Sequence, residues 1–319
     1  MQKDHSELLP TLAQQPLQWH SEHREVRVTV RSSRIQPSGF APPGALLRKT
    51  LVAVDIVCLL VAFIPFFICE VGLISPVRRG FFCNDSSISY PLHHPETIPD
   101  TVLIAAGTLI PFLAITVCEI FHVHYLPRSS HSVIFNPYAA ALYKEIGAFL
   151  FGCSVGLSLT NIAKVAVGRL RPHFLAVCRP NFTHISCSAG YLEDYLCTGS
   201  QAKEKEARKS FYSGHASFAM YTMMYLVFYL QARFTWQGAR LLRPLVQFVL
   251  LVLAMYTGLT RISDYRHHPS DVVVGLLQGA LVAYWVAFYV SSMFHCKQQR
   301  HPVPSSLLDS PSSDHHTDC

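Results

Sequence analysis

Six long stretches of apolar residues constrain the fold of this chain more than any other feature of its sequence. They cover 51–74, 102–118, 146–163, 216–232, 245–260 and 272–294. A helix needs about 20 predominantly apolar residues to cross a bilayer; the sixth stretch has that length, and the others reach it with one flanking turn. Backbone polar groups in lipid must be satisfied within the segment, which favours helices. We therefore predict an all-α fold, a bundle of six transmembrane helices, with kinks at Pro65 and Pro111.

The composition favours a membrane protein over other classes. Half of the 319 residues are hydrophobic and only 14% are charged, against roughly 25% in an ordinary soluble domain. A single apolar stretch is compatible with a buried core helix, but six of them with hardly any amphipathic helix elsewhere are not typical of a soluble protein. The net charge of +6 is modest and the basic residues are scattered, so we expect no nucleic-acid partner.

The two ends of the chain differ from its middle. Residues 1–47 are polar and contain several prolines, and we predict a disordered cytosolic arm there. Residues 297–319 are rich in Ser, Pro, His and Asp, and we predict a disordered cytosolic tail. The segment between them, 48–296, is the predicted six-span domain.

The orientation follows from an even number of spans, which places both termini on one side. Lysine and arginine only slightly favour cytosolic termini. Two N-x-[ST] sequons, at Asn84 and Asn181, both fall on the opposite face and favour the same orientation, with both asparagines as glycosylation sites. An oxidising exterior would permit disulfides among the four cysteines on that face, in any of three pairings. They are Cys83, Cys178, Cys187 and Cys197.

Three polar segments at that face are not explained by a membrane bundle. In the first, Lys164 and Arg171 are seven positions apart, which would place both on one helix face. Two cations on one face suit an anion with several oxygens. The alternative is that both side chains only snorkel to the interface or contact lipid headgroups.

The second segment, 211–217, opens the predicted fourth span. Ser213 is a good N-cap residue, and Gly214 lets the backbone approach a ligand closely. A helix start binds phosphate readily through its free N–H groups and its dipole, and His215 would lie beside it. The alternative is an ordinary cap with an interfacial histidine.

The third segment, 260–271, opens the predicted sixth span. His267 and Asp271 are four positions apart and would meet in a helix, with Pro269 in its first turn. A carboxylate bonded to one imidazole nitrogen fixes the tautomer and leaves the other nitrogen free to attack. Arg261 adds a third cation. The alternative is a loop that is merely rich in polar residues.

Together the segments supply three cations, an anion site at a helix start, two histidines and one acid at neighbouring span ends. That set suits phosphoryl transfer, in which catalysis depends mainly on positioning and electrostatics. The spacings also match those of a known family. Lys164 to Arg171-Pro172, Ser213-Gly214-His215, and Arg261 to His267 to Asp271 resemble the three signatures of the type 2 phosphatidic acid phosphatase superfamily, and 48–296 is similar to its animal lipid phosphate phosphatase branch.

The resemblance implies a role for each site residue. His267 would attack phosphorus and form a phosphohistidine, Asp271 would orient it, and His215 would protonate the leaving alcohol and then activate water. The phosphate would be bound by Lys164, Arg171, Ser213, Gly214 and Arg261. No cofactor or metal is expected, and the sequence has no carboxylate cluster that suits Mg²⁺.

The resemblance also implies substrates. Expected substrates are phosphatidate, lysophosphatidate, sphingosine 1-phosphate and ceramide 1-phosphate, hydrolysed by a homo-oligomer in the lipid bilayer. Because the three segments share a face with the two sequons, the site would face the exterior of the plasma membrane, or the lumen of the endoplasmic reticulum or Golgi. Two alternatives stay open: a non-enzymatic signalling relative, although such relatives typically lose catalytic residues that are present here, and a carrier that only binds lipid phosphate.

Overall fold

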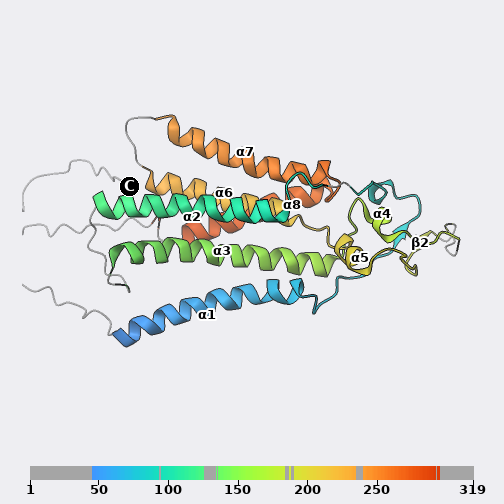
Figure 1. Ribbon diagram of the computed structural model, residues 1–319, viewed down its shortest axis with the longest axis horizontal. Coiled ribbons are helices and arrows are strands. Elements are labelled where there is room, and N and C mark those ends of the chain that lie inside the picture. The colour runs from blue at the N-terminus through green and yellow to red at the C-terminus, as the bar shows by residue number, and fades with distance from the viewer. Residues whose placement is uncertain are drawn as a thin grey trace, which may run out of the picture. The chain divides into compact units, whose positions relative to one another are not determined.

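The computed structural model of this chain describes residues 45–92, 95–125, 134, 136–183, 187, 190–234, 240–291 and 293–294. Its long helices are shown in Figure 1: α1 Ala45–Glu70, α2 Asp100–Tyr125, α3 Pro137–Val167, α6 Gly214–Arg233, α7 Leu242–Ser263 and α8 Pro269–Trp285. The short elements are β1 Phe81–Phe82, η1 Ser86–Ile88, α4 Phe174–Cys178, β2 Tyr191–Leu192, α5 Gln201–Ala207 and η3 Val286–Val290. The predicted all-α fold is confirmed. Apart from the first residues of α1, the predicted arms 1–47 and 297–319 lie outside the described residues.

Five of the described helices are long and apolar enough to cross a membrane: α1, α2, α3, α7 and α8. The predicted fourth span, 216–232, corresponds to α6, which does not meet that standard. The helix α6 packs against α2, α3, α7 and α8, and tyrosines along it are buried and hydrogen-bonded. A helix enclosed by protein can carry polar groups that a lipid-facing helix cannot. The count of six spans therefore stays a prediction.

Two glycines of α8 let this helix approach α6 closely. A Cβ at Gly275 would lie 2.6 Å from the Ser213 carbonyl oxygen, and a Cβ at Gly279 would lie closer still to that of Ser217. At the same junction the Ser213 N–H donates to the Asp271 carbonyl at 3.0 Å. The starts of α6 and α8, which carry two of the three predicted site segments, are therefore in backbone contact.

A serine of α3 supports α1 beside its proline. The Phe66 N–H, next to Pro65, donates to Ser158 Oγ at 3.2 Å, and Ser158 Oγ donates to the Ala62 carbonyl at 2.6 Å. The hydroxyl thus bridges a donor and an acceptor that would pair directly in a regular helix. Proline inside a span is tolerated where a neighbouring helix satisfies the freed groups, as the sequence indicated for Pro65.

The short elements α4, α5 and β2 form a small cap at one end of the long helices (Figure 1). Its disulfides, Cys83–Cys187 and Cys178–Cys197, fix the pairing that the sequence left open. The Arg208 guanidinium lies over the rings of Phe174 and Tyr195, with 5.1 Å and 5.4 Å to the centroids. Hydrophobic residues around them form a second core: Phe81, Ile88, Leu170, Val177 and Leu192.

Candidate active site

The three predicted segments meet where four helix ends converge. Lys164 is in the last turn of α3, His215 in the first turn of α6, Arg261 in the last turn of α7 and Asp271 in the first turn of α8. Arg261 Nη1 lies 3.2 Å from His215 Nε2, which joins the second segment to the third. Lys164 Nζ lies 3.2 Å from the position of a Cβ at Gly214, which joins the first to the second.

The expectation that Lys164 and Arg171 share one helix face was wrong. Helix α3 ends at Val167, because Gly168 adopts a left-handed conformation with φ of 60° and its N–H bonds to the Lys164 carbonyl. Arg171 reaches the site from the segment after this cap. It is buried, and its guanidinium is paired with the carboxylate of Glu206, which also lies 3.5 Å from Lys209 Nζ.

His267 is buried in the segment between α7 and α8, with 4% of its surface exposed. Its Nδ1 lies 2.7 Å from the carbonyl oxygen of Ser210. A carbonyl only accepts, so Nδ1 carries the proton and Nε2 is unprotonated in the neutral ring. Burial, followed by the charges of Arg171 and Lys164, lowers the pKa of His267 well below 6.5. The ring is therefore neutral at pH 7, with Nε2 available as a nucleophile.

Asp271 does not bond directly to the His267 ring, as the i, i+4 spacing suggested. The nearest carboxylate oxygen is 4.0 Å from Nδ1, because His267 precedes the helix and His268 is its N-cap. The fully buried carboxylate instead accepts from Arg169 Nη1 at 2.6 Å, from Ser210 Oγ at 2.5 Å and from the His268 N–H at 3.2 Å. Neither Arg169 nor Ser210 was predicted from the sequence as a site residue.

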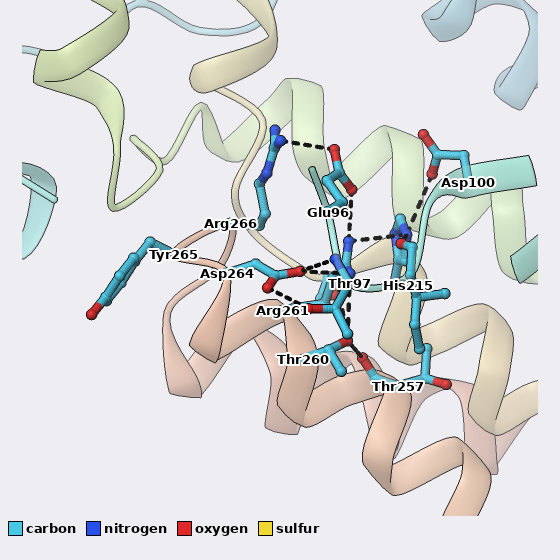
Figure 2. Close-up of polar contacts among 12 residues, drawn as sticks. Glu96, Thr97, Asp100, His215, Thr257, Thr260, Arg261, Asp264, Tyr265 and Arg266 are labelled. Atoms are coloured by element: carbon cyan, nitrogen blue, oxygen red, sulfur yellow. Dashed lines mark hydrogen bonds and ion pairs between the residues drawn. The ribbon is translucent and has the colours of Figure 1, made fainter. Parts of the chain in front are cut away.

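Arg261 is almost completely buried and has carboxylates on both sides (Figure 2). Its Nη1 lies 2.8 Å from Glu96 Oε2, and its Nη2 lies 3.0 Å from Asp264 Oδ2. Glu96 also pairs with Arg266 Nη2 at 2.9 Å. Glu96 precedes α2, in a segment that carried no signal in the sequence.

His215 lies beside Arg261, and its Nε2 faces groups of opposite kinds (Figure 2). The Ile98 carbonyl lies 3.2 Å away and the Asp100 carboxylate 3.5 Å away, and both favour a protonated nitrogen. The Arg261 guanidinium, also at 3.2 Å, is a donor and favours an unprotonated one. Burial, followed by the charge of the Arg261 guanidinium, lowers the pKa of His215 to about 3, so the neutral form of the ring is favoured at pH 7.

The start of α6 has the expected features of an anion site. Ser213 is the N-cap, and its Oγ accepts from the Ala216 N–H at 3.3 Å. The N–H groups of Gly214 and His215 belong to the first turn, where a helix provides no acceptor of its own. A side chain at Gly214 would crowd Lys164 Nζ. The glycine thus keeps the helix start and the ammonium group open to one ligand.

The two sequons lie on the cap, at the same end of the helices as the site. Asn84 and Asn181 are both exposed. Asn181 Oδ1 accepts from the N–H and the hydroxyl of Thr183, at 3.1 Å and 2.7 Å. Within the part of the chain that the structure describes, no group of three or more His, Cys, Asp or Glu is arranged to hold a metal ion.

Comparison with known proteins identifies the class. The PAP2 superfamily matches residues 145–293, which contain every residue of the three signatures. Phospholipid phosphatase 1 of Mus musculus is 51% identical over 249 residues, which are 77% of this chain and 87% of that protein. Phospholipid phosphatase 2 of Homo sapiens is 46% identical over 262 residues, 82% of this chain and 90% of that protein. The chain therefore belongs to the PAP2 superfamily, and it is a multi-pass membrane protein.

Within that superfamily the similarity extends to particular members. Phospholipid phosphatase 1 of Rattus norvegicus is 49% identical over 77% of this chain and 87% of its own length. No solved structure matches the chain.

Proposed function

We propose that this protein is a lipid phosphate phosphatase. Its substrates are phosphate monoesters: phosphatidate, lysophosphatidate, sphingosine 1-phosphate and ceramide 1-phosphate. The observation that carries the proposal is the buried His267, whose Nδ1 is 2.7 Å from a carbonyl and whose Nε2 is left as a neutral nucleophile near Arg171 and Lys164. Membership of the PAP2 superfamily and relatives named phospholipid phosphatase support the substrate class.

In the first step the phosphate binds to the cations Lys164, Arg171 and Arg261 and to the helix start at Ser213 and Gly214. His267 Nε2 then attacks phosphorus, and the ester P–O bond breaks as the N–P bond forms. His215 gains a proton when the bound phosphate offsets the charge of Arg261, and it gives this proton to the departing alkoxide, which leaves as the free alcohol. Asp271, 4.0 Å from Nδ1, offsets the positive charge that develops on the ring.

In the second step water attacks the phosphohistidine. His215, now neutral, takes a proton from the water, and the N–P bond breaks to release inorganic phosphate and regenerate His267. The three cations supply the positive charge that a metal ion brings to other phosphatases, so we propose that no metal or other cofactor is needed.

The site faces the extracellular side of the plasma membrane, or the lumen of the endoplasmic reticulum or Golgi. Six spans and cytosolic termini give this orientation. The two disulfides and both exposed sequons, at the site's end of the helices, support it. A lipid in the outer leaflet can then present its phosphate at the interface, where charged side chains avoid the cost of the bilayer centre. We further propose that the protein works as a homo-oligomer.

The test is phosphate release by purified full-length protein from micelles of each of the four lipids, with EDTA present. Wild-type protein should release phosphate, and His267→Ala should release none, because the proposed covalent intermediate needs that nitrogen. His124→Ala, in the last turn of α2 at the opposite end from the site, is the matched control. Binding of lipid phosphate without release would identify a carrier or a non-enzymatic relative instead. Turnover by His267→Ala would contradict the phosphohistidine.

A further inference from the structure

Ser210 connects the histidine and the acid that the signatures alone would pair directly. His267 Nδ1 is 2.7 Å from the Ser210 carbonyl oxygen, whereas it is 4.0 Å from Asp271. The hydroxyl of the same serine donates to Asp271 Oδ2 at 2.5 Å. Ser210 and Asp271 are completely buried, so water does not compete for these bonds.

Arg169 holds the other side of the same group. Its Nη1 lies 2.6 Å from Asp271 Oδ1, and its carbonyl accepts from the Ser210 N–H at 3.0 Å. Arg169 therefore fixes the serine through the backbone and the carboxylate through the side chain. The four residues form a connected network that includes no atom expected to touch substrate apart from the His267 ring.

We propose that Ser210 is a positioning residue for phosphoryl transfer, and that Asp271 orients the His267 ring through Ser210, with Arg169 as the anchor of both. This inference rests on the proposed function. The Ser210 carbonyl keeps the proton on Nδ1, so that Nε2 attacks phosphorus. The hydroxyl bond to Asp271 fixes the direction of that carbonyl and therefore the plane of the ring. The carboxylate stabilises the cationic phosphoimidazole across 4.0 Å, without taking its proton.

The experiment compares full-length variants in the micelle assay, with kcat expressed per vanadate-binding site so that loss of folded protein is not counted. Ser210→Ala should lower kcat at least roughly tenfold and leave KM nearly unchanged, because the lost bond is one to a charged, buried group. Ser210→Thr, which keeps the hydroxyl, should recover most of that loss. The matched control is Ser154→Ala, which removes a buried hydroxyl that bonds only within α3, to Leu150 O at 3.0 Å.

Two further variants test the connection itself. Asp271→Asn should lower kcat, and adding it to Ser210→Ala should lower kcat by less than the two single losses combined, because both changes break the same link while only Asp271→Asn also removes the charge. Arg169→Gln should lower kcat by less than Ser210→Ala, since the Arg169 side chain is 35% exposed and its ion pair is screened by solvent.

The outcomes separate this inference from the proposed function. Wild-type kcat in Ser210→Ala, with loss of kcat in Asp271→Asn, would mean that the carboxylate acts on the ring by its charge alone, and would overturn the role of Ser210 alone. Failure of Ser210→Thr to recover activity would assign the loss to packing and would also overturn it. Absence of phosphate release by the wild-type protein, or full activity of His267→Ala, would refute both the function and the inference.

Discussion

Replacing Gly275 with alanine should separate the two halves of the site. The new Cβ would lie 2.6 Å from the Ser213 carbonyl oxygen and 3.2 Å from the Ala216 Cβ. A carbon–oxygen contact normally needs about 3.3 Å, so the starts of α6 and α8 must move apart by roughly 0.7 Å. The bond from the Ser213 N–H to the Asp271 carbonyl, 3.0 Å long, would then exceed the length of a normal hydrogen bond.

The expected magnitude follows from that displacement. Forcing a methyl group into a packed helix contact costs about 1–3 kcal/mol of unfolding free energy. A misplacement of about 1 Å between catalytic groups can lower the rate roughly 100-fold, so we expect kcat of Gly275→Ala to fall between about tenfold and 100-fold. Phosphate release from lysophosphatidate micelles measures kcat and KM, and thermal unfolding in the same detergent measures stability.

Gly147→Ala in α3 is the matched control. Nothing lies within 4 Å of a Cβ at Gly147, so the same substitution should raise helix stability by about 1 kcal/mol and leave the activity unchanged. Wild-type kcat in Gly275→Ala would refute the claim that close contact between α6 and α8 aligns the site. Equal losses in both variants would show that the effect is not specific to this contact.

Three further outcomes are expected. Burial and the charges of Arg171 and Lys164 lower the pKa of His267 well below 6.5, and the neutral ring is the proposed nucleophile. The value of kcat/KM should therefore stay constant as the pH falls through 6.5 and decrease only at lower pH. Arg171→Gln should move this acidic decrease to higher pH, because the charge of Arg171 helps to lower the pKa of His267. Glu96→Gln should strengthen inhibition by vanadate about tenfold in dose–response assays, because a carboxylate no longer competes for Arg261. Asn181 should be glycosylated more fully than Asn84, measured by glycosidase shifts of single Asn→Gln variants, because its loop is the longer; an unmodified Asn181 would argue against this orientation.

The sequence predicted those features that depend on local pattern. Lipid-facing helices are apolar along their whole length, so α1, α2, α3, α7 and α8 were visible as apolar stretches. The N-cap Ser213 and the first-turn Pro269 follow from the preferences of a helix start, and both were found where the sequence indicated. Helix α6 gave a weaker signal, because it is enclosed by four other helices and carries buried, hydrogen-bonded tyrosines.

Contacts between distant segments were beyond the reach of these patterns. Ser210 meets Asp271 across 61 positions, and Arg261 meets Glu96 across 165. No sequence motif of fixed spacing identifies either of these two contacts. The end of α3 was missed for a different reason: Gly168 was visible, but the seven-residue interval from Lys164 to Arg171 was interpreted as continuous helix. A glycine near the end of an apolar stretch is itself a signal for a C-cap.

The paired cations of the site explain how it can be stable without a ligand. Arg261 is held by Glu96 and Asp264, and Arg171 by Glu206, so these buried guanidinium groups are not left as uncompensated charges. A phosphate that binds to either arginine must therefore share or replace a carboxylate contact. Lys164 differs from them, because its Nζ forms no ion pair within 4.0 Å among the described residues and faces Gly214 at the helix start. We therefore expect an incoming phosphate to meet Lys164 and the first turn of α6 first, and to displace the carboxylates from the arginines afterwards.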